Sequence, residues 1–433
     1  MRNHIRRAKD HQVLGRGSFA YGDLPYACDG NYSQDTTKFK GPTRVVGRLP
    51  DLRGAREPSY LLKLLKIAST WRPRDVEEYS RYFGMSTQSW EGSTAMSLFN
   101  IFGNSDAMSL APPTAPPLSA AKLAPLMHFI NCHGGSSDPR FFGETRSLKS
   151  QPVSMTSDAL KNKIKPGTVA SIECCYGAEL YDSVTLALPM PICQRYLEQG
   201  AYGYFGSSTI AYGPPSGNGA ADLLCQYFLR RVIAGSSLGR AALEARLEFS
   251  GGAAELDPVD LKTLAQFSLL GDPSIHCVAA SVPLPTVATP KSAASAKGFA
   301  AAIADAAVAR TDRRRQLFSR GARIGATQAC AIKIAKPKLG GALTAVLEKM
   351  AAQLSIHEPK ILSYKVESPA APKSGPLAFA RKSGPFARLA EPDTFHVVTG
   401  ARTVPQITLR QVVAMVAKEV GGKIVSYREM QSR

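Results

Sequence analysis

Two residues of this 433-residue sequence have the types and positions needed for covalent catalysis, His133 and Cys175. Each follows a short apolar stretch that we predict to be a buried strand, LMHFIN (126–131) before the histidine and TVASIEC (168–174) before the cysteine. In an open α/β sheet the loops at the carboxyl ends of the strands form the ligand crevice, so both side chains would face one site. A thiolate attacks a carbonyl carbon, and an imidazole supplies both the base and the proton donor that the reaction needs. The pair therefore predicts nucleophilic catalysis at a cysteine.

A parallel sheet has to position this pair. Between residues 123 and 276 short apolar runs alternate with helical stretches, which is typical of a largely parallel sheet covered on both faces. We predict a third strand at 201–209 and helices at 192–199, 218–233 and 238–249. The expected fold class is α/β.

The rest of the chain divides by composition. Upstream we expect a strand end at 44–50, helices at 58–70 and 74–82, and a Pro-rich loop that marks a subdomain boundary near 108–120. The Pro-, Ala-, Ser- and Lys-rich stretch 281–298 has the composition of a flexible linker between a catalytic domain at 15–280 and a C-terminal region at 299–433. That region is predicted to be a small α+β unit, partly disordered, with helices at 299–320, 341–354 and 407–420, strands at 395–398 and 423–427, and a disordered run at 368–385.

Charge separates the same two parts. Lys and Arg number 53 and Asp and Glu 34, a net charge of +19. Residues 1–280 hold 29 basic and 25 acidic side chains, whereas residues 281–433 hold 24 and 9. A region this basic attracts nucleic acid, acidic membrane surface or an acidic protein, although a merely soluble basic surface is the simpler interpretation.

Composition also bounds the class of protein. Hydrophobic residues form 44% and charged residues 20% of the chain, so most of it should fold. No apolar run approaches the ~20 residues of a membrane span, and the N-terminal segment has no apolar stretch typical of a signal peptide. The eight cysteines lack the dense spacing of a disulfide scaffold, and we expect free thiols and a cytoplasmic location. No CxxC pair indicates zinc, no motif supports calcium activation, and we expect no cofactor.

The segments FINCHGG and SIECCYGA resemble the two catalytic strands of the caspase superfamily. The 42-residue interval between His133 and Cys175 is close to what that arrangement requires. Five further segments, in family order over roughly residues 20–277, resemble the gingipain branch: DLPYACDGNYS, VVGRLP, GAYGYFGSSTIAYGP, GSSLGRAALEAR and LLGDPSIH. The resemblance implies a caspase-like sheet and a cysteine endopeptidase that acts on polypeptides.

The resemblance also implies roles for individual residues. Cys175 occupies the position of the nucleophile, while the Cys-x-x-Gly spacing of some relatives would select Cys174 instead. Because side chains alternate along a strand, only one of the two thiols can meet His133. The backbone N–H groups of Gly134, which has no Cβ, and of Cys175 would stabilise the oxyanion. No third catalytic carboxylate is obvious.

Specificity is expected to depend on Glu173. In caspase-like folds the residue two positions before the nucleophile lines the S1 pocket, and a carboxylate there predicts cleavage after Arg or Lys. The alternative is a glutamate hydrogen-bonded within the end of the sheet. Asp138, Asp182 and Ser207 are weaker candidates for the pocket.

Two other functions compete with an active endopeptidase. One is a caspase-like scaffold or sensor that has little hydrolytic activity and acts through protein–protein contacts. The other is polyanion binding by residues 299–433, whose signature would be a steep fall in affinity with salt.

Overall fold

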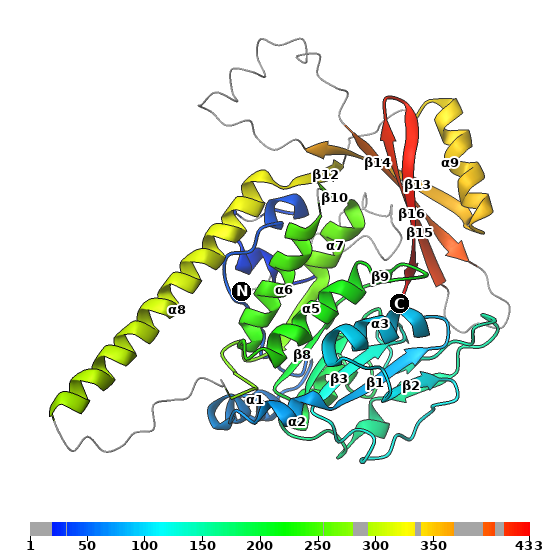
Figure 1. Ribbon diagram of the computed structural model, residues 1–433. Coiled ribbons are helices and arrows are strands. Elements are labelled where there is room, and N and C mark those ends of the chain that lie inside the picture. Colours follow the sequence, from blue (N-terminus) through cyan, green and yellow to red (C-terminus); the bar gives the residue numbers. More distant parts are fainter. Residues whose placement is uncertain are drawn as a thin grey trace, which may run out of the picture.

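A computed structural model describes residues 20–31, 33–253, 255–279, 293–333, 339–367, 393–402 and 411–433. In this part of the chain a six-stranded sheet and a seven-stranded sheet lie one above the other, and a three-stranded sheet accompanies the first (Figure 1). All eight cysteines fall in it and are free, as predicted, and each of them is buried. None of its helices combines the length and hydropathy of a membrane span.

The six-stranded sheet carries the predicted catalytic strands. Its order is β11-β8-β7-β3-β1-β2, with parallel neighbours throughout except the antiparallel pair of β11 and β8. Its strands are β1 (Tyr82–Thr87), β2 (Met108–Ala111), β3 (Met127–Asn131), β7 (Val169–Ile172), β8 (Gly203–Ser207) and β11 (Phe267–Gly271).

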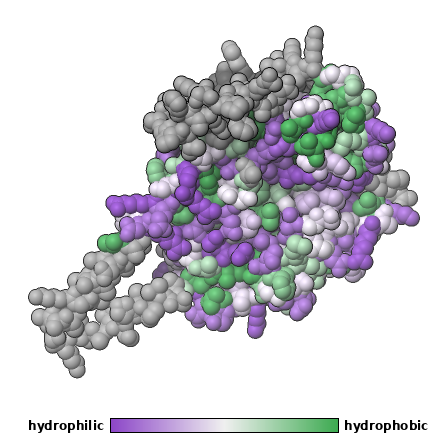
Figure 2. Space-filling model, turned by 45° about the horizontal axis from the view of Figure 1, so that its top comes forward, coloured by the Kyte–Doolittle hydropathy of each residue, from purple (hydrophilic) through white to green (hydrophobic). Residues whose placement is uncertain are grey.

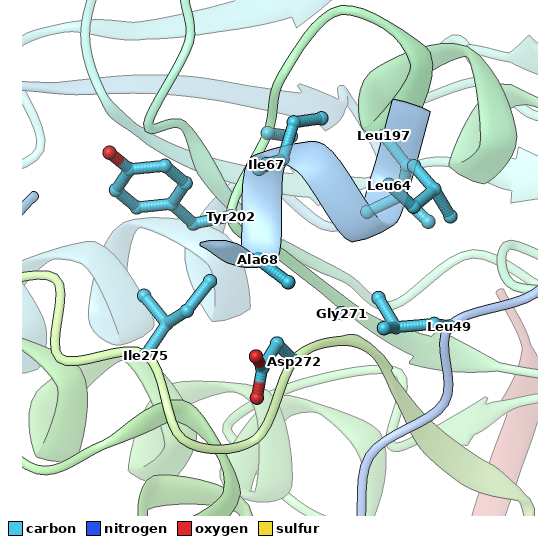
Figure 3. Close-up of a pocket in the computed structure, with 10 residues that line it drawn as sticks. Leu49, Leu64, Ile67, Ala68, Leu197, Tyr202, Gly271, Asp272 and Ile275 are labelled. Carbon is cyan, nitrogen blue, oxygen red and sulfur yellow. The ribbon is translucent and has the colours of Figure 1, made fainter. Parts of the chain in front are cut away.

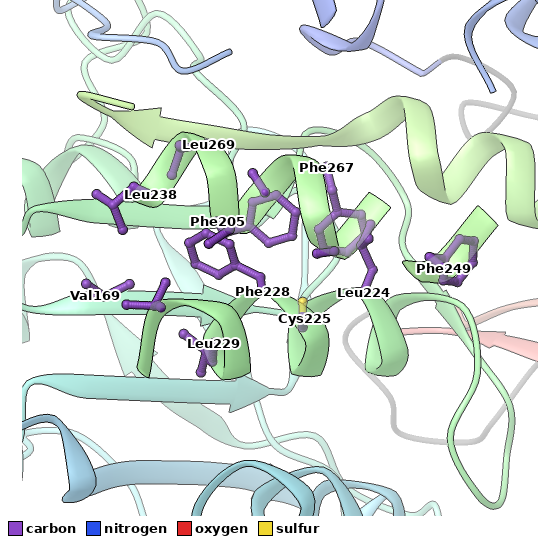
Figure 4. Close-up of a cluster of buried hydrophobic side chains, with 14 of the residues drawn as sticks. Val169, Phe205, Leu224, Cys225, Phe228, Leu229, Leu238, Phe249, Phe267 and Leu269 are labelled. Carbon is purple, nitrogen blue, oxygen red and sulfur yellow. The ribbon is translucent and has the colours of Figure 1, made fainter. Parts of the chain in front are cut away.

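Both faces of this sheet are buried under helices. Phe205 of β8 stacks on Phe228 with ring centroids 4.5 Å apart, and Val169 of β7 lies in the same cluster (Figure 4). A residue adjacent to each of these in its strand, Tyr204 before Phe205 and Ala170 after Val169, lies in a second cluster on the other face. The predicted α/β class, a mostly parallel sheet with helices on both faces, is confirmed. The helices around it are α1 (Ser59–Thr70), α2 (Val76–Ser80), α3 (Glu91–Phe102), α4 (Ile192–Glu198), α5 (Ala221–Ile233), α6 (Leu238–Gly252) and α7 (Pro258–Gln266), with 3₁₀ turns at Leu24–Ala27, Thr36–Phe39 and Asp158–Leu160.

The N-terminal prediction was wrong in one place. Residues 44–50 form no strand, and only Arg48 makes an isolated parallel bridge, to Leu270. Gly47 packs closely on Gly271 and Pro273, so this segment touches the edge strand at one place and adds no strand to the sheet. Strand β1 and helix α3, in the stretch 82–102, were not predicted.

A short three-stranded sheet follows β3 directly. It contains β4 (His133–Gly134), β5 (Arg140–Phe142) and β6 (Val153–Thr156), in that order and antiparallel. Residue His133 pairs with Phe142 across β4 and β5. This pairing holds His133, two residues after the end of β3, against strand β5.

The C-terminal residues build the seven-stranded sheet, and both its edges belong to the first part of the chain. Its order is β10-β12-β13-β14-β15-β16-β9. Helix α9 (Gly341–Gln353) packs on one face. The strands are β9 (Tyr212–Gly213), β10 (Glu255–Leu256), β12 (Ala329–Lys333), β13 (His357–Glu367), β14 (Thr394–Arg402), β15 (Gln411–Val420) and β16 (Lys423–Ser432).

The predicted helix at 407–420 was wrong, because the described residues from Gln411 on form strand β15. Alternate residues of β15 enter two different cores: Ala414 and Val416 lie in one, and Val413 and Met415 in the other. A strand buried on both faces gives a continuous apolar run, which periodicity cannot separate from a buried helix.

Helix α8 (Ala293–Thr327) connects the two sheets and carries an arginine triplet. It begins inside the predicted linker, of which residues 281–292 lie outside the described part, as does the predicted disordered run at 368–385. Arg313 and Arg315 are exposed, 3.7 Å from Glu244 and 3.6 Å from Asp312. In Figure 2 the coloured part of the surface carries many hydrophilic residues, with smaller hydrophobic patches between them. Polyanion binding by residues 299–433 stays a prediction.

Candidate active site

His133 and Cys175 leave the parallel sheet at the same level. Ile130 of β3 pairs with Ile172 of β7, and each candidate lies three residues beyond that pair. A side chain at Gly134 would overlap the carbonyl oxygen of Cys175, so the two loops approach as closely as only glycine permits. The structure therefore places the two predicted loops in contact.

The two neighbouring thiols point to opposite faces of the sheet. Cys175 lies in the cluster that contains α5, and its Sγ donates to the carbonyl oxygen of Ala211 over 3.5 Å. Cys174 lies in the other cluster beside Tyr196, with its Sγ 4.0 Å from the carbonyl oxygen of Ile130. Cys174 is thus packed into the core between the sheet and helices α1 and α4.

Burial keeps both thiols protonated in this structure. It raises the pKa of Cys175 to about 12, although hydrogen bonding to Ala211 and the charges of Lys262 and Arg433 oppose the shift. It raises the pKa of Cys174 well above the ordinary value. A neutral thiol is a poor nucleophile, so attack by Cys175 requires a base at the moment of reaction.

His133 is held between an aromatic ring and a carboxylate. Its ring centroid lies 4.4 Å from that of Trp90, edge to face. Its Nε2 lies 3.3 Å from Oε1 of Glu144, within ion-pair distance but not aligned for a hydrogen bond. Gln151 donates to the same carboxylate oxygen over 3.1 Å. A carboxylate facing one ring nitrogen favours the tautomer with its proton there and leaves the other nitrogen as the base.

Glu144 is a third polar member of the site that the sequence did not reveal. Burial raises its pKa, but the His133 ring and hydrogen bonds from Ser89 and Gln151 outweigh burial and hold the pKa below its ordinary value. Eleven residues separate it from His133, and only the pairing of β4 with β5 brings the two together. Local sequence gives no signal of such a hairpin contact.

We expect Glu144→Gln to lower kcat roughly 10- to 100-fold, because the neutral amide no longer orients the imidazole or stabilises its charged form. A depressed folded pKa stabilises the fold above the unfolded value of about 4.3, and that contribution disappears as the pH falls through the folded pKa. The variant should therefore lose stability less steeply than the wild type below about pH 4. Urea unfolding at pH 3–7 and peptide hydrolysis measure both effects. Glu78→Gln on α2 is the surface control, and an unchanged kcat in Glu144→Gln would exclude a positioning role.

Arg433, the last residue of the sequence, reaches into this site. Its backbone oxygen accepts a hydrogen bond from the Cys175 N–H over 3.0 Å, and its own N–H donates to Ala211 over 3.1 Å. Its guanidinium is fully buried, 3.0 Å from both carboxylate oxygens of Asp222, and lies 4.4 Å from the centre of the Trp90 ring. Figure 1 shows the chain end at the junction of the two sheets, beside β9 and α3.

The carboxylate that pairs with this guanidinium is Asp222 and not the predicted Glu173. Asp222 lies in the first turn of α5 and also accepts from the hydroxyl of Ser93 over 3.0 Å. Glu173 is fully buried next to Asp222, and neither of its oxygens has a hydrogen-bond partner. Burial, and then the charge of Asp222, raise the pKa of Glu173 well above its ordinary value. Glu173 thus lies beside the pocket in surroundings that favour its neutral form.

Lys262 of α7 supports the segment that faces Cys175. Its Nζ donates to the hydroxyl of Thr209 over 3.0 Å and to the carbonyl oxygen of Ile210 over 2.6 Å, and it also contacts Gln266. Burial lowers its pKa to about 7. The lysine therefore holds residues 209–211 in place under the thiol.

The three weaker candidates lie apart from these contacts. Asp138 accepts from the guanidinium of Arg140 over 2.8 Å and 3.0 Å, and Asp182 accepts from the backbone of Thr185 over 2.9 Å. Ser207 is buried at the end of β8, where its hydroxyl donates to the carbonyl oxygen of Thr209 over 2.9 Å. The structure gives none of them a contact with Arg433.

A separate pocket, lined mostly by apolar side chains, lies at the amino-terminal end of β8, away from His133 and Cys175. It is lined by side chains that include Leu49, Leu64, Ile67 and Tyr202 (Figure 3). Its volume of about 10 Å³ holds at most one water molecule. Among the described residues no group of three His, Cys, Asp or Glu side chains could hold a metal ion.

A buried histidine and a cysteine at neighbouring strand ends, with a main-chain N–H beside the thiol, are groups that a cysteine peptidase can use. Residues 82–278 match the model of peptidase family C25, a family of cysteine peptidases. The resemblance to gingipain-like peptidases predicted from the sequence is confirmed over this segment, and so is the enzyme class, a cysteine-type hydrolase that acts on polypeptides.

Other comparisons add little. Among solved structures, a chain described as "Structure of Protease" is similar with a TM-score of 0.41 and 12% sequence identity, covering 96% of this chain and 79% of that one. No curated protein matches the sequence.

Proposed function

We propose that the chain is a cysteine endopeptidase that cleaves after Arg, and less efficiently after Lys, with Cys175 as the nucleophile and His133 as the acid–base partner. The position of Arg433 is the observation that supports this proposal most strongly. Its carbonyl oxygen lies on the N–H of Cys175, where an oxyanion would be stabilised, and its guanidinium lies on Asp222. A substrate residue on the acyl side of the scissile bond has to meet the same two requirements.

The reaction follows from these groups. His133 takes the thiol proton of Cys175, and Sγ attacks the scissile carbonyl carbon while the N–H of Cys175 donates to the developing oxyanion. Collapse breaks the C–N bond, and the imidazolium gives its proton to the leaving amine. A water molecule then attacks the thioester and loses a proton to His133, which restores the thiol and releases a carboxylic acid.

The walls of the pocket favour arginine over lysine. The guanidinium plane lies against the Trp90 ring while one nitrogen contacts both oxygens of Asp222. A planar guanidinium can lie flat on the ring and pair with the carboxylate at the same time, whereas the compact ammonium group of lysine has no plane to stack and ends closer to its own backbone. The buried Glu173 adds negative potential whenever it ionises.

Peptides with Arg, Lys or Asp at P1 and a fluorogenic leaving group test the proposal. Because Arg433 fills the pocket in this structure, the assay is run on the wild type and on Arg433→Ala. We expect kcat/KM for the Arg peptide to exceed that for the Lys peptide roughly tenfold and that for the Asp peptide by more than 1,000-fold. The last difference is the largest because a P1 aspartate would bury a second negative charge beside Asp222. A thiol alkylating reagent should abolish the activity. If neither protein cleaves any of these peptides, with or without added calcium, the proposal fails.

A further inference from the structure

The last three residues of the sequence lie in the arrangement of a bound peptide substrate. Gln431 and Ser432 of β16 pair antiparallel with Gly213 and Tyr212 of β9, and Arg433 continues this ladder to Ala211 and Cys175. Proteins commonly bind an extended peptide by adding it to an exposed strand, with main-chain hydrogen bonds for affinity and a side-chain pocket for specificity. Strand β9 would be such an edge if β16 did not cover it.

We infer that β9, Ala211 and the N–H of Cys175 form the track that binds the main chain of a substrate, and that residues 431–433 of the same chain fill this track as an internal inhibitor. Arg433 takes the P1 position, Ser432 P2 and Gln431 P3. The inference rests on the proposed function, since a blocked track has a consequence only if the track serves catalysis. The ligand class is an extended peptide with arginine at P1.

The rest of the C-terminal sheet holds this segment in register. Strand β16 pairs with β15 along most of its length, through a turn in which Gly421 and Gly422 have φ of 57° and 80°. Arg428 of β16 bridges to Asp260, 2.8 Å away, and to Asp257, both at the start of α7. Met430 is buried in the core that also contains Tyr212.

The pocket leaves several buried polar atoms without a partner. Nε and Nη1 of Arg433 are buried without a hydrogen-bond partner, and so are both oxygens of Glu173. Buried groups that lack partners weaken a complex relative to one that satisfies them. A two-residue ladder with β9 is also short, whereas β15 pairs with β16 at eight positions. Release of the last residues would leave the hairpin of β15 and β16 intact.

A binding assay tests the inference without catalysis. A fluorescent peptide ending in Gln-Ser-Arg is titrated into the full chain carrying Cys175→Ala, and into the same protein with Arg433→Ala added. We expect the second protein to bind at least ~10-fold more tightly, because its pocket is open. Lys423→Ala, a basic residue at the exposed start of β16, is the matched control and should leave the affinity at the Cys175→Ala level.

The outcomes separate the inference from the proposed function. Equal affinity with and without Arg433 would overturn the inference, and so would failure of the peptide to bind either protein. Tighter peptide binding by the Arg433→Ala protein without any cleavage would support the peptide-binding track, but it would overturn the proposed activity and with it the role of residues 431–433 as an inhibitor. Because Arg433→Ala leaves Asp222 unpaired, a thermal melt checks that the variant is folded. Arg433→Lys keeps the charge, and we expect it to increase the affinity for the peptide less than Arg433→Ala does.

Discussion

Cys175→Ala should reduce kcat/KM for a peptide with P1 arginine by roughly 10⁴-fold or more, because removal of the nucleophile leaves only binding and the oxyanion contact. The matched variant is Cys174→Ala, one residue earlier on the same strand end. Its thiol packs on the opposite face beside Tyr196, so we expect kcat/KM within about tenfold of the parent and a loss of about 1–2 kcal/mol in stability. Both variants are made in the Arg433→Ala protein, in which the pocket is open.

The same two variants can also contradict the assignment of Cys175 as the nucleophile. If Cys174→Ala loses the activity and Cys175→Ala retains it, the nucleophile is Cys174 and the loop must rearrange before catalysis. A reactive arginyl ketone adds an independent readout, since intact mass should show one adduct on Cys174→Ala and none on Cys175→Ala. Adducts on both proteins would mean that the reagent labels another cysteine.

Asp222→Asn should cause the second-largest loss of kcat/KM for a peptide with P1 arginine. Truncating one partner of a buried hydrogen-bonded charge pair costs about 2–5 kcal/mol, which corresponds to roughly 30- to 5,000-fold in kcat/KM for P1 arginine. Glu173→Gln is the matched control, because Glu173 is buried nearby with a raised pKa and an amide has nearly the shape of the protonated acid. We expect a change of less than about tenfold for this variant, by the usual size of a neutral replacement.

The opposite result would assign the specificity to Glu173 instead of Asp222. A large loss in Glu173→Gln beside a small loss in Asp222→Asn would make Glu173 the specificity residue, as the resemblance first implied. Hydrolysis of peptides with P1 citrulline, the neutral isostere of arginine, supplies a second readout. Asp222→Asn should narrow the preference for arginine over citrulline, since the amide no longer pairs with a cation.

The positions of His133 and Cys175 after the ends of two strands were predictable, because the local sequence determines where these strands end. An apolar run of strand length followed by glycine or a turn gives the position of a strand and of the residue after it. Asp222, Glu144 and Trp90 were not predictable in the same way, because each comes from a different element and joins the site only through the tertiary fold. Asp222 left one faint signal, as the one acidic residue of helix α5, in its first turn.

The C-terminal errors have a different origin. Strand β15 is buried on both faces, so its apolar residues show no alternation that would separate a strand from a helix. Charge and composition identified the change of character near residue 280 but carried no information on β9 and β10, which join the second sheet from the first part of the chain. Pairing between residues more than 200 positions apart, as between Tyr212 and Ser432, has no local signature.

The seven-stranded sheet is attached at both edges, through β10 to β12 and through β9 to β16. A segment held this way competes with substrate as a tethered group, at an effective concentration of about millimolar for a short flexible tether and independent of how much protein is present. We therefore expect the ratio of wild-type to Arg433→Ala specific activity to stay constant when both enzymes are diluted. If the inhibiting segment came from a second molecule, dilution would dissociate it and the ratio would rise.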